Sequence, residues 1–363
     1  MKRKWSLRLG AAVLCAVLLG SCGSTAAAPA ESTAPADPLT GQQLLYPEQR
    51  AAAVVIENTT GSTTQWGIGS ASVVLEAAAR ADTAPSLCLV YPSVSAMPTV
   101  GPVTLGQDLF WRLLSGQQVL PIQRGCDLYT RNFLDYWSLR AVDALETGRN
   151  AFTTGNTDWA SPLWCTNGQS VAKVLGSLSL SSALSEDPAE SADSTQEGDT
   201  PAVPTVPALL PQQTDGHLPD ADAADAVQAA VQFPSGSTTC FAYDTDTGTY
   251  GMMHNDGSPQ LDANTGIQAA FDNLLVLYSA STPRDDGRTL DYDLTMGGGL
   301  WLNGGHLWHI TWTQGTGSTF AFYDADGRPL RILSGRSYIA WLSSLTGEEV
   351  TVQDSAGNDL LQP

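Results

Sequence analysis

The chain has 363 residues, and its 37 acidic against 17 basic residues give a formal net charge of −20. Such a surface argues against nucleic acid and anionic lipid headgroups as ligands, because binding either relies on clustered lysine and arginine. With low-complexity segments set aside, the length leaves room for two domains of roughly 100 to 150 residues.

The first 21 residues have the pattern of a secretion signal. Four basic residues stand among the first eight, and residues 9–20 are apolar apart from glycines, as in a secretion signal. A membrane-spanning helix needs roughly 20 apolar residues, so this run is too short to cross a bilayer. Leu-Gly-Ser-Cys at 19–22 resembles the bacterial lipobox, in which the cysteine is diacylated and the chain is cut before it. We therefore expect residues 1–21 to be a lipoprotein signal peptide, and acylated Cys22 to hold the protein in the lipid bilayer, on the extracytoplasmic face of the cell membrane. The alternative is an ordinary cleaved signal in which Cys22 is incidental.

Two segments have compositions typical of disordered chain. Residues 22–37 are small, polar and proline-containing, and we expect a flexible tether there. Residues 183–225 hold ten acidic residues, several prolines and no lysine or arginine. Such a segment cannot bury enough apolar surface to offset the chain entropy lost on ordering. We expect it to be a disordered, acidic, proline-rich insert between two folded regions.

Residues 38–182 alternate between strand-like and helix-like patterns, which favours an N-terminal α/β domain. Expected strands cover 51–58, 86–92 and 117–124, and expected helices cover 69–80, 105–116 and 132–145. In the first of these helices Val73, Val74 and Ala77 share one side, and in the second Leu109 and Leu113 do so.

Residues 226–363 consist of short aromatic and β-branched runs separated by Asp-Gly, Asn-Gly-Gly and Ala-Gly-Asn turns. This pattern predicts a mainly antiparallel β domain at the C-terminus. In one run Trp308, Ile310 and Trp312 fall on one face of a strand, whereas His309 falls on the other. The expected fold class is therefore α+β, with the α/β domain first and the β-rich domain second.

Four cysteines remain beyond the lipobox, and their pairing cannot be read from the sequence. Cys88, Cys126, Cys165 and Cys240 would allow two disulfides in three connectivities outside the cell. Cys88 lies in an apolar run and could instead be a small core residue. The absence of a Cys-x-x-Cys motif argues against zinc.

Motifs for metal binding and catalysis are weak. His306 and His309 stand three residues apart, and such positions point to opposite faces of a strand, so they cannot bind one ion together. Asp244 and Asp246 resemble half a calcium loop, but the glycine comes one position early, which favours a hairpin turn. We therefore assign no metal ligand, no cofactor and no catalytic residue.

Ordered blocks along the chain resemble the YerB-like family of bacterial lipoproteins, a two-part domain without an established reaction. The blocks are DPLTG at 37–41, VGPV at 100–103, YDTDTGTY at 243–250 and FYDADGR at 322–328. The resemblance covers roughly residues 37–180 and 235–343. It implies an α/β first part, a β-rich second part and membrane anchoring.

The resemblance also suggests positions for a ligand site and shows where this chain departs from the family. The family-equivalent positions are Asn58, Gly101, Pro102, Thr104, Gln107 and Asp262. The family has arginine where this chain has Thr104 and Gln107, and neither side chain replaces the bidentate hydrogen bonding of a guanidinium group. One hypothesis is therefore a degenerate paralogue that has lost the family ligand.

The sequence favours a membrane-anchored binding or scaffold module for an envelope protein or a cell-wall polymer. The default site is a cleft between the two domains. Exposed members of the ten tryptophans would suit sugar rings or peptide anchors. The competing hypothesis is an envelope hydrolase that works through carboxylates the sequence does not identify. Glu57, Glu76, Asp127 and Asp135 could form a pair, but their spacing does not require one, and surface or capping roles are the alternative.

Overall fold

A mixed sheet of 12 strands runs through the computed structural model and joins the N-terminal to the C-terminal region. The structure describes residues 36–58, 65–155, 163–185, 206–214, 218–315 and 319–361. Cys22 and the expected signal and tether up to residue 35 lie outside the described residues. Among the described residues, no helix is both long and apolar enough to cross a membrane.

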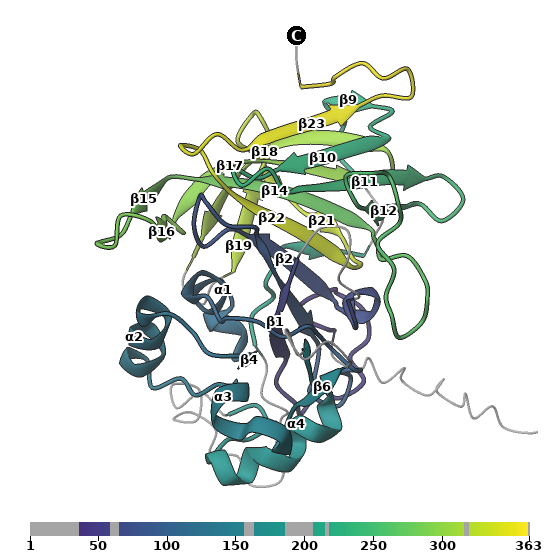
Figure 1. The fold of residues 1–363 in the computed structure, drawn as a ribbon. Coiled ribbons are helices and arrows are strands. Elements are labelled where there is room, and N and C mark those ends of the chain that lie inside the picture. The colour runs from purple at the N-terminus through teal and green to yellow at the C-terminus, as the bar shows by residue number, and fades with distance from the viewer. Residues whose placement is uncertain are drawn as a thin grey trace, which may run out of the picture. The chain divides into compact units, whose positions relative to one another are not determined.

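The N-terminal region supplies one half of this sheet and most of the helices (Figure 1). Its sheet strands are β1 (Ala52–Glu57), β2 (Val73–Ala77), β3 (Ser86–Tyr91), β4 (Leu120–Gln123) and β5 (Val142–Asp143). The helices are α1 (Asp108–Leu113), α2 (Leu128–Tyr136), α3 (Ala144–Thr147) and α4 (Gly168–Leu175), with short 3-10 turns η1 (Ile68–Ser70), η2 (Ser115–Gln117), η3 (Gly148–Asn150) and η4 (Gly176–Leu178). A small hairpin pairs β6 (Thr153–Gly155) with β7 (Leu163–Cys165).

The C-terminal region completes the large sheet and adds a second one. Its strands in the large sheet are β9 (Ala223–Ala224), β14 (Asn273–Ser279), β17 (Met296–Asn303), β18 (His306–Gln314), β19 (Phe320–Tyr323), β20 (Pro329–Leu330) and β22 (Ser337–Ser343). The second, five-stranded sheet contains β10 (Gln228–Gln232), β11 (Thr238–Asp244), β12 (Thr249–Met253), β13 (Ala270–Phe271) and β23 (Glu349–Gln353). Two further pairs are β15 (Ser281–Pro283) with β16 (Leu290–Tyr292) and β8 (Gln212–Gln213) with β21 (Ile332–Leu333).

The two halves of the large sheet meet where β2 pairs in parallel with β22. The register runs from Val73 opposite Ser337 to Ala77 opposite Trp341. Both strands are buried along their whole length, so this seam lies at the centre of the sheet. The sequence suggested a cleft between the N-terminal and C-terminal domains. The structure instead joins the two regions there by a hydrogen-bonded pair of strands.

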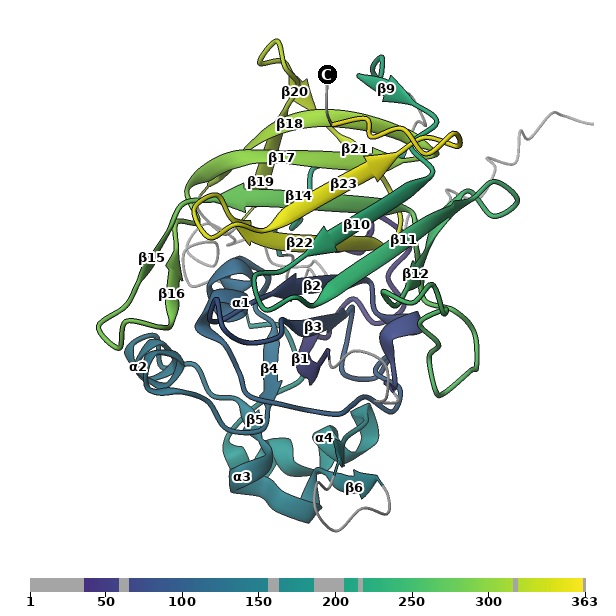
Figure 2. The same ribbon diagram turned by 45° about the horizontal axis from the view of Figure 1, so that its top comes forward.

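Apolar side chains cover both faces of the large sheet. On one face Val74, Leu274 and Tyr338 pack with residues of the five-stranded sheet, such as Phe241. The strands of this second sheet cross over β14 and β22 in Figure 2. The other face holds a separate apolar cluster that includes the tryptophans at 111, 301, 308, 312 and 341. The large sheet is thus the middle layer of the fold.

The expected fold class, α+β with a β-rich C-terminal region, is confirmed. The expected strands at 51–58, 86–92 and 117–124 are β1, β3 and β4, and the expected helix at 105–116 contains α1. In β18 Trp308, Ile310 and Trp312 are buried whereas His309 and Thr311 are exposed, as the alternation predicted.

The helix expected over residues 69–80 is wrong, because this stretch forms β2. A strand covered on both faces has no alternation of polar and apolar residues, so its continuous apolar run cannot be told from a buried helix. The helix expected at 132–145 is shorter than predicted. α2 ends at Tyr136, and Val142–Asp143 forms β5 before α3 begins.

The expected disorder of 183–225 is also wrong for part of that segment. Residues 206–214 and 218–225 are placed, and they contribute β8 and β9. Leu209 and Leu210 are buried in the apolar cluster that contains the tryptophans. Burial of these two side chains helps to order the segment. The acidic residues around them dominate its composition, so the composition alone predicted disorder.

Because β2 and β22 share one buried sheet, we expect the two regions to unfold in one transition. Replacing Ile339, fully buried in β22, by Ala should lower the free energy of unfolding by about 3 kcal/mol. Urea unfolding followed by circular dichroism and by labelling of the buried Cys88 thiol should then give the same lowered midpoint. The exposed Thr311→Ala variant serves as a control, and separate midpoints for the two probes would contradict a shared sheet.

Candidate functional site

The positions predicted from the family fall along one edge of β1 and around residues 65–69. Asn58 directly follows β1, and its Oδ1 accepts a hydrogen bond of 3.4 Å from Nε2 of Gln65. The next residue, Trp66, exchanges backbone hydrogen bonds of 2.8 and 3.3 Å with Gly101. Residues 65–69 therefore connect the end of β1 to the Gly-Pro segment.

Pro102, Thr104 and Gln107 continue from this point towards α1. The chain here runs antiparallel to β1, with Glu57 N donating to Pro102 O and Thr104 N donating to Val55 O, both at 2.9 Å. Gln107 precedes α1 without capping it through its side chain. Thr104 and Gln107 thus lie beside β1 and at the start of a helix.

Asp262 clamps a loop of the C-terminal region onto η1. Its carboxylate is fully buried and accepts from the backbone N–H groups of Gly67 at 3.1 Å, Gly69 at 2.8 Å and Asn264 at 2.8 Å. A Cβ at Gly69 would lie 3.0 Å from an oxygen of this carboxylate, so glycine allows the close approach. These contacts describe a structural role for Asp262.

Glu76 is a buried carboxylate in the middle of the seam. It has no exposed surface, and it accepts hydrogen bonds from the Tyr338 hydroxyl of β22, from the Thr239 hydroxyl of β11 at 3.0 Å and from Asn58 Nδ2 at 2.5 Å. Burial raises the pKa of Glu76 from 4.5 to about 7, although the three donors oppose the shift. One side chain therefore links β2, β22, the second sheet and a predicted site residue.

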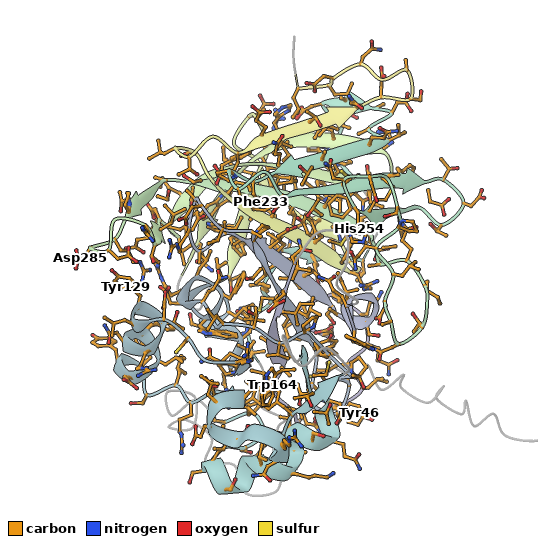
Figure 3. All side chains as sticks on the ribbon, viewed as in Figure 1. Tyr46, Tyr129, Trp164, Phe233, His254 and Asp285 are labelled. Atoms are coloured by element: carbon orange, nitrogen blue, oxygen red, sulfur yellow. The ribbon has the colours of Figure 1, made fainter. Side chains whose placement is uncertain are left out.

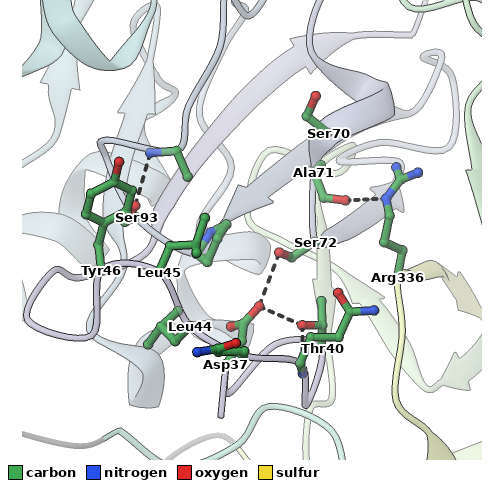
Figure 4. A pocket seen from close by; sticks show the side chains of 14 residues that line it. Asp37, Thr40, Leu44, Leu45, Tyr46, Ser70, Ala71, Ser72, Ser93 and Arg336 are labelled. Carbon is green, nitrogen blue, oxygen red and sulfur yellow. Dashed lines mark hydrogen bonds between the residues drawn. The ribbon is translucent and has the colours of Figure 1, made fainter. Parts of the chain in front are cut away.

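A small cavity of about 180 Å³ lies between η1 and the segment before β1 (Figure 4). Arg336, at its edge, donates to the carbonyl oxygens of Ala71 at 2.8 Å, Ala270 at 2.6 Å and Ile68 at 2.9 Å. Burial lowers the pKa of Arg336 and raises that of Asp37, which also lines the cavity. Since the Arg336 contacts hold backbone segments together, we interpret this cavity as part of the scaffold.

A larger, open groove of about 570 Å³ lies between helices α1 and α2 and the β15–β16 hairpin. The hairpin is attached to the end of β2, because Leu290 N donates to Ala79 O and the Tyr292 hydroxyl donates to Ala78 O, both at 2.9 Å. One wall of the groove thus belongs to the N-terminal region and the other to the C-terminal region.

Two aspartates and two arginines form the floor of this groove. Arg284 Nη2 lies 2.6 Å from Asp108 and 3.1 Å from Asp291, and Arg112 Nη1 lies 2.7 Å from Asp291 and 3.6 Å from Asp108. Burial alone would lower the pKa of Arg284. The hydrogen bonds and negative charges of Asp108 and Asp291 together have the larger effect, so the pKa of Arg284 is raised. Both carboxylates are therefore engaged with guanidinium groups.

The walls of the groove combine aromatic and polar side chains. Tyr129 and Asp285, which lie near each other in Figure 3, belong to α2 and to the hairpin respectively. The Arg284 guanidinium stacks 4.8 Å above the Tyr129 ring. Asn132 and Phe133 line the same wall of α2.

The aromatic surface of α2 continues beyond the groove. Tyr136 is 79% exposed and Trp137 61% exposed, with their ring centroids 5.2 Å apart, and Phe133 lies 6.5 Å from Trp137. Thr130 and Leu134 of the same helix are buried. A mixed polar groove that continues into an aromatic surface is suited to binding an extended ligand.

The remaining predicted residues show no metal site or disulfide. No disulfide joins any two of the cysteines at 88, 126, 165 and 240. Cys88 is a buried core residue, and its burial raises the pKa of its thiol. His306 and His309 are both exposed, and His309 Nδ1 lies 3.1 Å from Asp222. Among the described residues, no cluster of three histidine, cysteine, aspartate or glutamate side chains could hold a metal ion.

Comparison with known proteins places the chain in a family. A family model described as "Protein of unknown function (DUF3048) N-terminal domain" matches residues 39–180, and its C-terminal counterpart matches residues 229–339. The chain belongs to the DUF3048 family. The resemblance to YerB-like proteins predicted from the ordered sequence blocks is thereby confirmed.

Two findings from Bacillus subtilis support the same assignment. The protein named "Putative lipoprotein YerB" from strain 168 is 26% identical over 358 residues, which is 96% of this chain and 98% of that protein. The crystal structure of the YerB protein from Bacillus subtilis matches with a TM-score of 0.70 at 19% identity, over 87% of this chain and 99% of that one. The structural match shows that this DUF3048 chain shares the YerB fold.

Sequence reasoning missed the groove, although part of its signal is visible. The aromatic positions 129, 133, 136 and 137 follow a helical spacing of i, i+4, i+7 and i+8, which predicts one shared helix face. The facing hairpin is about 150 residues away in sequence, so no local pattern places it there.

Protonation of Glu76 should make stability depend on pH. Its pKa is raised in the folded state, so between pH 4.5 and about 7 the folded protein keeps a proton that the unfolded chain loses. The free energy of unfolding should therefore fall by about 3 kcal/mol as the pH rises through this window. Urea unfolding at several pH values should show this slope in the wild type and in Glu57→Gln, and its loss in Glu76→Gln. An unchanged slope in Glu76→Gln would contradict the assignment.

The clamp made by Asp262 should contribute strongly to stability. Asp262→Asn removes the negative charge and replaces one of the two accepting oxygens by an NH2 donor, which leaves at least one backbone N–H group without its acceptor. We therefore expect the free energy of unfolding to fall by about 3 kcal/mol. Asp256→Asn, in an exposed turn, should change it little. Equal effects of the two substitutions on the urea midpoint would show that Asp262 does not act as a clamp.

Proposed function

We propose that the protein is a lipoprotein, anchored through Cys22 on the extracytoplasmic face of the membrane, that binds an envelope protein or a cell-wall polymer in the groove between α2 and the β15–β16 hairpin. The observation that carries the binding role is the exposed aromatic surface next to a mixed polar groove. Such surfaces supply apolar contact area and hydrogen-bonding groups together.

The anchor rests on the N-terminal sequence and on the name of the Bacillus relative. Cys22 ends a lipobox-like stretch, and the matched relative is named a lipoprotein. From Cys22 to the first described residue, Ala36, an extended tether would span up to about 50 Å. The fold could therefore reach ligands well above the membrane surface.

The charges in the groove favour binding over hydrolysis. A glycosidase needs one carboxylate that donates a proton and another that acts as base or nucleophile. Asp108 and Asp291 both form ion pairs with Arg284 and Arg112, so these two carboxylates are already engaged with guanidinium groups. Glu76 could hold a proton near neutral pH, but it has no exposed surface. Because Glu76 cannot reach a substrate, it does not support the hydrolase alternative.

Lipid attachment is tested by metabolic labelling with a fatty acid. Wild-type protein should incorporate the label, whereas Cys22→Ala should incorporate none. Cys126→Ser, which changes a half-buried cysteine of the fold, should keep the label. Label retained in Cys22→Ala would exclude Cys22 as the acylated residue.

Binding through the groove is tested by co-sedimentation of the detergent-solubilised full chain with detergent-washed cell envelopes. Replacing both Tyr136 and Trp137 by Ala should lower the bound fraction by about tenfold, because stacking of aromatic rings contributes on the order of 1 kcal/mol each. Both side chains are exposed, so the fold should be unaffected. Tyr46→Ala, which removes an exposed tyrosine away from α2, should bind like the wild type. Equal binding by the double variant would overturn the proposed function.

A further inference from the structure

The chemistry of the groove between α2 and the β15–β16 hairpin is specific enough to indicate a class of ligand. We propose that it binds an uncharged glycan chain, with sugar rings stacked on Phe133, Tyr136 and Trp137 and sugar hydroxyls bonded to the polar walls. This inference rests on the proposed function, because it takes the groove to be the binding surface.

The aromatic side chains form a continuous strip along one face of α2. Asp127 caps the helix by accepting from Thr130 N at 2.7 Å, and the helix ends at Tyr136, with Trp137 as its C-terminal cap residue. Because an α-helix rises 1.5 Å per residue, the strip from Tyr129 to Trp137 is about 12 Å long. This length exceeds a single sugar ring, so the strip fits a short run of rings.

Sugar rings match an exposed aromatic strip because one face of a pyranose carries mostly C–H groups. Stacking these groups on an aromatic ring removes apolar surface from water while the ring hydroxyls stay at the edge. Tyr136 and Trp137 present 79% and 61% of their surface to solvent, so neither needs to move to accept such a contact. The helix holds both residues in place before binding, which lowers the entropic cost of association.

The polar groups of the groove are both donors and acceptors, which suits the hydroxyl groups of a glycan. Arg112, Arg284 and Asn132 can donate, whereas Asp285 and Asp291 accept. Sugar hydroxyls do both, so they can bond to either kind of group. A proline-rich peptide offers carbonyl oxygens and few N–H groups, so it would cover the exposed Asp285 carboxylate without giving it a donor.

Charge excludes polyanions from this site. The charged residues that line the groove are three aspartates and two arginines, and the whole chain carries a net charge of −20. A phosphate-bearing polymer would be repelled by this field, since binding such polymers requires a basic surface. An uncharged polyol chain is compatible with this pattern of charges.

Isothermal titration calorimetry on the full chain in detergent micelles tests this assignment. The probes are the tetramer of β-1,4-linked N-acetylglucosamine, the tetramer of β-1,4-linked glucose, a proline-rich dodecapeptide and a poly(glycerol phosphate). We expect at least one of the two tetrasaccharides to bind, and neither the peptide nor the phosphate polymer to do so. Failure of both tetrasaccharides, or tighter binding of either other probe, would overturn the glycan assignment.

Substitutions then locate the binding on the groove. Trp137→Ala should weaken tetrasaccharide binding by about tenfold, which corresponds to about 1.4 kcal/mol. Asp285→Asn, an exposed change in the polar wall, should weaken it less, and Tyr46→Ala should leave it unchanged. Equal affinity in Trp137→Ala would show that the sugar binds elsewhere.

The two proposals fail in different ways. If both tetrasaccharides fail to bind while the Tyr136 and Trp137 double variant still loses envelope binding, the glycan assignment is wrong and the groove remains the binding surface. If the double variant binds envelopes like the wild type, the proposed function is wrong as well.

Discussion

The parallel pairing of β2 with β22 is the contact on which the rest of the structure depends. These two strands join two segments more than 250 residues apart, and Glu76 reinforces the pair through Tyr338. The β15–β16 hairpin bonds to the residues that directly follow β2, at Ala78 and Ala79. The seam therefore holds the two walls of the groove in one body, and a change at the seam is also a change in the groove.

How well each element could be predicted from the sequence depends on how many of its faces meet solvent. β18 has one exposed face, and its alternation placed Trp308 and His309 on the correct sides. β2 is covered on both faces, so its apolar run was taken for a helix. Leu209 and Leu210 lie in an acidic, proline-rich context that concealed their burial. For β2 and for Leu209 and Leu210, the missing information was contact with segments distant in sequence.

The same limit applies to the candidate site. Asn58, Gly101 and Asp262 gather around residues 65–69, and their contacts there are those of a scaffold, with the Asp262 carboxylate bonded to backbone N–H groups. The groove needs α2 and a hairpin that follows it by about 150 residues, and only the helix half has a local signal. Arg284 pairs with Asp108, which precedes it by 176 residues, so it could not have been assigned to the groove from sequence spacing.

Hydrogen–deuterium exchange of the full chain, with and without a tetrasaccharide that binds, tests most directly whether the joined halves form one binding groove. The account predicts slower exchange in two separate stretches, residues 128–137 of the helix and residues 281–292 of the hairpin. It predicts no change at residues 36–46, around the small cavity lined by Asp37 and Arg336. Protection confined to one wall, or found around residues 65–69 and 262–268 instead, would contradict it.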